Sequence, residues 1–253
     1  MKKLYEKSEL AFALFWIILY CVVQSVANPI NGWLGVESVA HAAFNVVFTV
    51  VLLFWITQNG LQKRYGLCKT AVPARGFLWY LPLVVLASHN LWNGVAANFP
   101  LLDGLCYLCY MLCVGFVEEV LFRGFLFQAI AKDSRKLAVI LSSVTFGLGH
   151  LLHLVDGSGV ELVANLCQVV GAIAVGLLFV TIFDRGGSLL PCIITHAAID
   201  GVSTFANETG LTVQRRMVLC LIQLVIVVGY TLILRRMLPP KGDSSTLCQA
   251  EGS

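Results

Sequence analysis

The sequence consists mainly of long apolar segments separated by short polar ones. Apolar runs bounded by polar residues predict about eight membrane spans, at about 10–27, 39–57, 77–92, 101–130, 137–153, 161–183, 187–206 and 217–234. A helix needs about 20 mostly apolar residues to cross a bilayer. Only 12% of the 253 residues are charged, against about 25% in a soluble domain. The sequence therefore predicts an all-α, polytopic transmembrane helical bundle.

The length of the chain limits its domain organisation. About eight spans use roughly 160 residues, which leaves only short loops and no room for a second domain. We expect a single transmembrane domain at 1–238 and a disordered cytoplasmic tail at 239–253, where Pro, Gly and Ser are frequent. The low charge content and the net charge of +3 exclude a nucleic-acid-binding chain and an ordinary cytosolic enzyme.

The basic residues predict the orientation of the chain, because Lys and Arg are retained on the cytoplasmic side of a membrane. Starting from a cytoplasmic N-terminus, the predicted loops place fourteen of the 17 Lys and Arg residues on the cytoplasmic side: Lys2, Lys3, Lys7, Lys63, Arg64, Lys69, Arg75, Lys132, Arg135, Lys136, Arg185, Arg235, Arg236 and Lys241. Arg215 and Arg216 fall on the other side, and Arg123 lies within a span. We therefore expect both termini to be cytoplasmic.

Three groups of ionisable residues lie inside the predicted spans. Each such residue costs about 2.5–3.5 kcal/mol on insertion scales, so it marks function by default. The fourth span carries Glu118, Glu119 and Arg123, the fifth carries His150, and the seventh carries His196 with Asp200. At about 1.5 Å per residue, Glu118, His150 and Asp200 lie roughly 20 Å from the cytoplasmic end, and His196 roughly 13 Å. These residues from three spans can therefore share one level.

The spacing within the fourth span separates two roles. Glu119 and Arg123 are four residues apart on a helix, so they can neutralise each other as structural support. Glu118 lies about 100° round the helix and has no partner there, which makes it the candidate general base. The alternative is an ion-pair network that only fixes helix packing.

A carboxylate and two histidines in an apolar cavity suit the activation of water, and two mechanisms are open. In one, Glu118 and His150 take a proton from water, while His196 and Asp200 stabilise the oxyanion. In the other, Glu118, His150 and His196 bind a divalent metal such as zinc. An ionised Asp200 cannot donate a hydrogen bond, so it is protonated, orients His196 or binds the metal. The cofactor is therefore either none or a divalent metal.

Three short motifs in this order resemble those of the CPBP family, which comprises the CAAX prenyl endopeptidases and the bacteriocin-processing or Abi proteins. They are EExxxR, FxxxH and HxxxN/D, represented by Glu118, Glu119 and Arg123, by Phe146 and His150, and by His196 and Asp200. The resemblance spans residues 118–200 and implies an intramembrane endopeptidase, a glutamic or metallo-endopeptidase, with its catalytic core at 101–206. It implies that Glu118 and His150 activate the water, that His196 and Asp200 form the oxyanion or supporting pair, and that Glu119 and Arg123 are structural.

The resemblance also implies partners and a location. The substrate would be a peptide or protein, membrane-associated or lipidated, since the eukaryotic relatives trim prenylated C-terminal tails and many bacterial members act in peptide maturation. The short loops resemble those of a bacterial plasma-membrane member. We expect contact with the lipid bilayer and none with nucleic acid. Two other functions stay open: a non-catalytic immunity or scaffold protein, and a proton-coupled transporter that uses Glu118 and the histidines as a relay.

Overall fold

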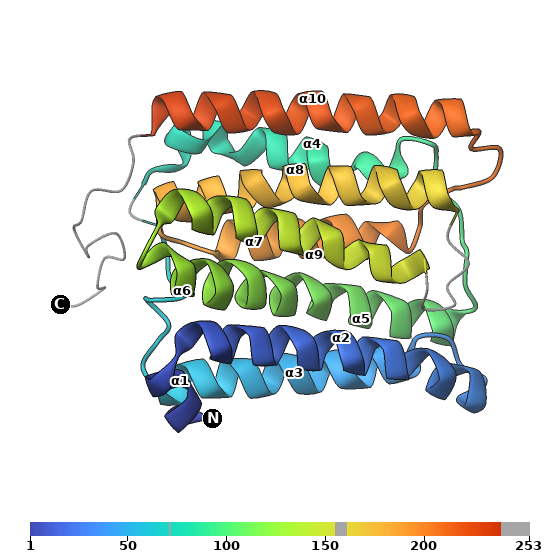
Figure 1. Ribbon diagram of the computed structural model, residues 1–253. Helices are drawn as coiled ribbons and strands as arrows, with labels where there is room; N and C mark the ends of the chain where they lie inside the picture. Colours follow the sequence, from blue (N-terminus) through green and yellow to red (C-terminus); the bar gives the residue numbers. More distant parts are fainter. Residues whose placement is uncertain (71, 155–160, 239–253) are drawn as a thin grey trace.

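The computed structural model describes residues 1–70, 72–154 and 161–238, and the predicted tail at 239–253 lies outside them. In the described residues every regular element is a helix, which confirms the predicted all-α fold. The long helices are α2 (Glu9–Leu34), α3 (Val39–Gln58), α5 (Leu101–Glu119), α7 (Arg135–Gly149), α8 (Leu162–Gly186) and α10 (Val213–Met237). They run side by side along one common axis (Figure 1).

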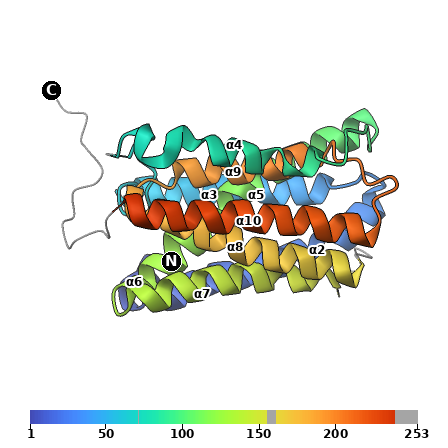
Figure 2. The ribbon, with the colours of Figure 1, turned by 90° about the horizontal axis from the view of Figure 1, so that it is seen from above.

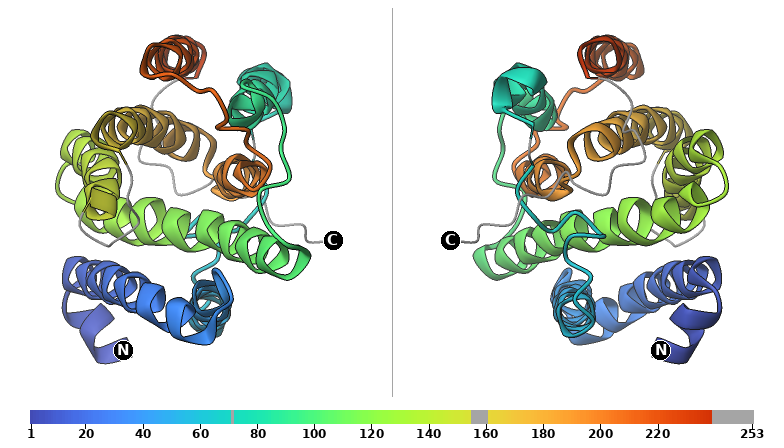
Figure 3. Two further views of the ribbon diagram at one scale, coloured as in Figure 1. Left: turned by 90° about the vertical axis from the view of Figure 1, so that its right-hand side faces the viewer. Right: turned by 90° about the vertical axis from the view of Figure 1, so that its left-hand side faces the viewer.

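Seen along this axis, the helices form layers (Figure 3). The helices α2 and α3 make one outer layer, and α5 crosses the middle of the molecule. α5 packs against α3 on one side and against α9 (Leu190–Ser203) on the other. α8 lies between α7 and α10 and packs against both. Between the layer of α2 and α3 and the helix α10 therefore lie α5, α7, α8 and α9 (Figure 1). Seen from above, α4 and α7 lie along opposite edges of the bundle, with α10 in front between them (Figure 2).

Six helical segments of the described chain are long and apolar enough to cross a membrane, so the predicted number of eight spans is approximate. The predicted seventh span corresponds to α9, which is only 14 residues long. The predicted third span, 77–92, is broken into η1 (Ala74–Tyr80), α4 (Leu81–Ala87) and η2 (His89–Leu91). The break lies at Leu78, Trp79 and Tyr80, which have φ values of 50°, 50° and 58°. Left-handed backbone in non-glycine residues ends a regular helix.

Side-chain caps set where several helices begin. The hydroxyls of Ser8, Ser134 and Thr212 accept hydrogen bonds from backbone N–H groups in the first turns of α2, α7 and α10. Each cap satisfies an N–H group that has no partner inside its helix. The helix α8 ends at Gly187, whose φ of 74° is readily adopted only by glycine. Local sequence therefore defines these helix ends.

Predicted cytoplasmic basic residues gather at one end of the bundle. Glu9 Oε2 pairs with Arg64 Nη2 at 2.5 Å and with Lys132 Nζ at 3.0 Å, and Arg135 pairs with Asp184 at 2.5 Å. The short helix α1 (Lys2–Lys7) and the C-terminal end of α10 lie at this same end (Figure 1). Both observations agree with α1 and the end of α10 on one side of the membrane, and the assignment of that side to the cytoplasm stays a prediction.

The helices α5 and α9 approach each other closely at Gly115. A Cβ atom on this residue would lie 2.4 Å from the backbone nitrogen of Ala197 and 2.6 Å from its Cα atom. Small residues at such contacts let the backbones of membrane helices come together. Because Gly115 is one turn before Glu119 and Ala197 directly follows His196, this contact brings the two ionisable groups within reach of each other.

We expect Gly115→Ala to lower the free energy of unfolding by about 1–3 kcal/mol, because the added methyl group must separate α5 from α9. The measurement is unfolding by dodecyl sulfate in mixed micelles. Gly229→Ala on α10 is the control, since a Cβ atom there meets nothing within 4 Å. Equal stability of the two variants would contradict the close contact.

Candidate active site

Glu119 and Arg123 form an ion pair in the core of the bundle. Arg123 Nη1 donates to Glu119 Oε1 at 2.9 Å, and both side chains have no exposed surface. Within the described residues, Glu119 Oε2 and the Nε and Nη2 atoms of Arg123 are buried without a hydrogen-bond partner. The pairing predicted from the i, i+4 spacing is therefore present, and it carries two fully desolvated charges.

The backbone after Glu119 is not an ordinary α-helix. The segment η3 (Val120–Leu126) is a π-helix that joins α5 to α6 (Phe127–Ala131). Its wider turn directs the N–H of Phe127 to the carbonyl of Phe122, which also accepts a hydrogen bond from Ser142 Oγ at 2.9 Å. Such turns occur mostly as single insertions in α-helices, frequently at functional sites. The i, i+4 pattern did not predict this change of backbone, and Arg123 lies fully buried within the π-helical segment.

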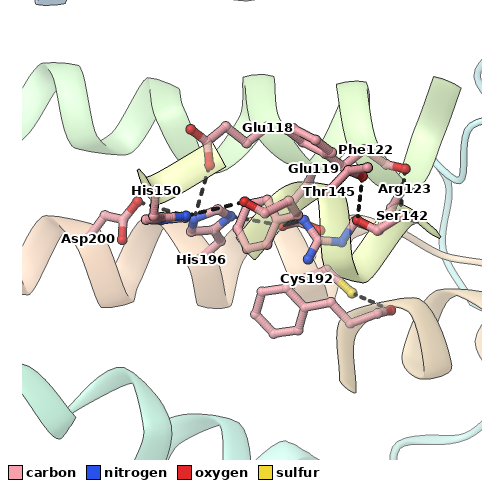
Figure 4. Close-up of polar contacts among 12 residues, drawn as sticks. Glu118, Glu119, Phe122, Arg123, Ser142, Thr145, His150, Cys192, His196 and Asp200 are labelled. Atoms are coloured by element: carbon pink, nitrogen blue, oxygen red, sulfur yellow. Dashed lines mark hydrogen bonds and ion pairs between the residues drawn. The ribbon is translucent and has the colours of Figure 1, made fainter. Parts of the chain in front are cut away.

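His196 is the residue around which the three carboxylates converge (Figure 4). Its Nδ1 lies 2.8 Å from Glu119 Oε1, and its Nε2 lies 3.3 Å from Asp200 Oδ2 and 3.8 Å from Glu118 Oε2. A neutral imidazole has a single N–H donor, whereas the imidazolium donates from both nitrogens. The sequence predicted the neighbourhood of His196 and Asp200 but missed the hydrogen bond to Glu119, which ties α5 to α9.

Phe146 connects the ion pair with both histidines. The guanidinium Cζ of Arg123 lies 4.0 Å from the centre of the Phe146 ring, a cation–π contact. The ring also makes edge contacts with His150 at 5.4 Å and with His196 at 5.7 Å between centroids. Phe146 is therefore a packing platform for the site, a role that the FxxxH motif does not reveal.

His150 lies beside this cluster, at the start of the 3₁₀-helix η4 (His150–Leu154). Its Nδ1 lies 3.3 Å from the carbonyl oxygen of Phe146, and its own carbonyl accepts a hydrogen bond from Asn165 Nδ2 at 2.7 Å. Because both imidazoles touch the Phe146 ring, the structure brings His150 and His196 to the same region. Asn165, on α8, is a supporting residue that the sequence analysis missed.

A second missed residue is Tyr20 on α2. Its hydroxyl donates a hydrogen bond to Glu118 Oε1 at 3.0 Å. A tyrosine in an apolar helix has no spacing that relates it to a glutamate 98 residues away, so local patterns contain no signal for this contact. The site therefore includes a residue, Tyr20, from outside the predicted core at 101–206.

The hypothesis of a metal bound by Glu118, His150 and His196 stays a prediction. Among the described residues, no group of three or more His, Cys, Asp or Glu side chains is arranged to hold a metal ion. Nδ1 of His196 faces Glu119, while Nε2 faces Asp200 and Glu118, so the contacts of this ring alone do not distinguish a hydrogen-bond donor from a metal ligand.

The site is a cluster of carboxylates and histidines inside a bundle of apolar helices. Ionisable residues at such a depth in a membrane protein mark a functional site. Residues 100–202 match the family model described as type II CAAX prenyl endopeptidase, Rce1-like. This match confirms the predicted resemblance to the CPBP family, and it covers every predicted site residue. No curated protein and no solved structure matches the chain. The match supports, in general terms, an intramembrane protease of the CAAX type.

We expect Arg123→Leu to lower the free energy of unfolding by about 3–5 kcal/mol, because it leaves the Glu119 carboxylate buried without its counter-charge. Dodecyl sulfate unfolding in mixed micelles measures this change. The matched control is Lys2→Ala, which removes another i, i+4 pair, with Glu6, whose side chains are 73% and 60% exposed. This control should change stability by less than about 1 kcal/mol. Equal effects would mean that the buried pair contributes no more than a surface pair.

Proposed function

We propose that the chain is an intramembrane endopeptidase that hydrolyses peptide bonds with a water molecule activated by Glu118. The observation that carries this proposal is the separation of 3.8 Å between Glu118 Oε2 and His196 Nε2. This separation is too long for a direct hydrogen bond, and a water molecule within hydrogen-bond distance of both atoms would lie to one side of the line that joins them. The family match over residues 100–202 supports a peptide as the substrate.

In this mechanism Glu118 is the general base. Its side chain is 17% exposed, against 0% for Glu119, so it is the more accessible of the two adjacent carboxylates. Glu118 Oε2 takes a proton from water, and the hydroxide attacks the carbonyl carbon of the scissile peptide bond. Protonated Glu118 then returns the proton to the leaving amine. His150 assists in activating the water, and we assign its Nε2 to this step because Nδ1 faces the Phe146 carbonyl.

His196 stabilises the oxyanion of the tetrahedral intermediate through the N–H at Nε2. Glu119 orients the ring through Nδ1. Asp200 Oδ2 lies 3.3 Å from Nε2, so it holds this N–H before the reaction, and the oxyanion replaces it as the acceptor while Asp200 stabilises the positive charge of the ring. Donors that are aimed in advance at the developing charge provide a large part of the rate acceleration in such reactions. Of the roles open for Asp200, this geometry favours the orientation of His196.

The family name suggests the substrate class. The matched family comprises prenyl endopeptidases, so we propose that this chain cleaves a lipid-modified C-terminal peptide presented from the bilayer. Bacteriocin processing, the other activity that the resemblance implies, remains the alternative substrate class, and a bacterial plasma membrane remains the proposed location. A cleavage assay with a farnesylated and an unmodified peptide of the same sequence distinguishes the two substrate classes.

We expect Glu118→Gln to lower kcat by about 10²–10⁴-fold, because the amide cannot accept the proton of water. The purified protein in nanodiscs is assayed with a lipidated peptide, and its fold is followed by circular dichroism. Glu208→Gln is the control, since the Glu208 side chain is 70% exposed and pairs with Arg216. Full activity of Glu118→Gln would refute the assignment, and a peptide-independent proton flux would favour the transporter instead.

We expect cleavage to continue after treatment with a chelator, because among the described residues no three His, Cys, Asp or Glu side chains are arranged to hold a metal ion. The measurement is peptide cleavage before and after dialysis against the chelator, with the metal content determined by elemental analysis. Activity that disappears on chelation and returns with zinc would favour the mechanism in which Glu118, His150 and His196 bind a metal.

A further inference from the structure

The first transmembrane helix contributes a side chain to the candidate active site. Tyr20 lies on α2, outside residues 100–202, and its hydroxyl donates to Glu118 Oε1 at 3.0 Å. Tyr20 is only 5% exposed. The Tyr20 hydroxyl therefore points into the protein. Removing this hydroxyl would leave Glu118 Oε1 without its tyrosine donor.

The ring of Tyr20 is held in place by its surroundings. It packs edge to face on Phe48 of α3, with centroids 5.6 Å apart and an interplanar angle of 86°. Trp16, one turn earlier on α2, packs on the same Phe48 ring at 6.1 Å. A tyrosine side chain has two rotatable bonds before the ring, so these contacts fix the position of its hydroxyl. The helix α2 also packs directly against the π-helix that follows Glu119.

This hydrogen bond makes the two oxygens of Glu118 different. Oε1 accepts from Tyr20, whereas Oε2 lies 3.8 Å from His196 Nε2. A glutamate has three rotatable side-chain bonds, and an anchor on one oxygen restricts the direction of the other. A hydrogen bond between a neutral donor and a carboxylate is also stronger than one between two neutral groups.

We propose that Tyr20 is a positioning residue that fixes the Glu118 carboxylate with Oε2 directed at the reacting water, an inference that rests on the proposed function. Tyr20 does not touch the substrate in this proposal and acts only through Glu118. The active site is consequently shared between the core matched by the family model and the outer layer formed by α2 and α3.

The test compares two variants that each remove one buried tyrosine hydroxyl. Tyr20→Phe removes the donor to Glu118, and Tyr230→Phe on α10 removes a donor to the carbonyl of Phe77 at 2.7 Å. We expect Tyr20→Phe to lower kcat by about 10–100-fold, because a hydrogen bond to a charged group is lost, with KM changed by less than about twofold. Tyr230→Phe should leave both constants unchanged. Equal losses of kcat in the two variants would reduce Tyr20 to a structural residue and overturn the proposal.

A second measurement does not depend on activity. Dicyclohexylcarbodiimide modifies carboxyl groups in apolar surroundings, and mass spectrometry of the purified full chain gives the rate of modification at Glu118. We expect this rate to change severalfold in Tyr20→Phe and to stay at the wild-type value in Tyr230→Phe. If wild-type protein cleaves no peptide but the modification rate changes as expected, the positioning contact stands and the proposed function is wrong. If neither kcat nor the modification rate changes in Tyr20→Phe, the positioning role is wrong and the proposed function is unaffected.

Discussion

The buried pair of Glu119 and Arg123 is the interaction on which the rest of the structure depends. Each charge would be strongly unfavourable alone at this depth, so each requires the other. The pair also reaches beyond its own helix, since Glu119 binds His196 on α9 and Arg123 stacks on Phe146 of α7. One ion pair thereby joins three helices, and it contacts both His196 and the Phe146 ring on which His196 packs.

Small residues provide the space for this network. Gly115 lets α5 approach α9, and at Gly176 a Cβ atom would lie 3.1 Å from Arg123 Nη2 and 3.2 Å from the Cα atom of Ser143. The helix α8 thus closes over the guanidinium with no side chain between them. Without these two glycines, the distances between Glu119, Arg123 and His196 would lengthen, and hydrogen bonds between buried charges lose strength steeply with distance.

The sequence predicted those features that depend on local spacing or composition. Apolar runs predicted the helical membrane fold, and four-residue spacings predicted the contacts between Glu119 and Arg123 and between His196 and Asp200. The π-helix, the bond between Glu119 and His196, and the hydroxyl of Tyr20 arise from packing between distant segments, on which local periodicity carries no information. The break in the predicted third span was missed for a related reason. Hydropathy depends on the apolar character of the side chains and carries no information on backbone dihedral angles, so it did not predict the left-handed residues before Pro82.

The order of the contacts along the chain has a consequence for biosynthesis. The N-terminal part of a protein is made first, so α2 and α5 are present before α9. Glu118 then already has the Tyr20 hydroxyl as a donor, and Glu119 already has Arg123 in the same segment. The carboxylates can therefore be accommodated in the bilayer while His196 has still to be synthesised. His196 and Asp200 are made last, so the cluster of three carboxylates around the imidazole is complete only after α9 has been synthesised.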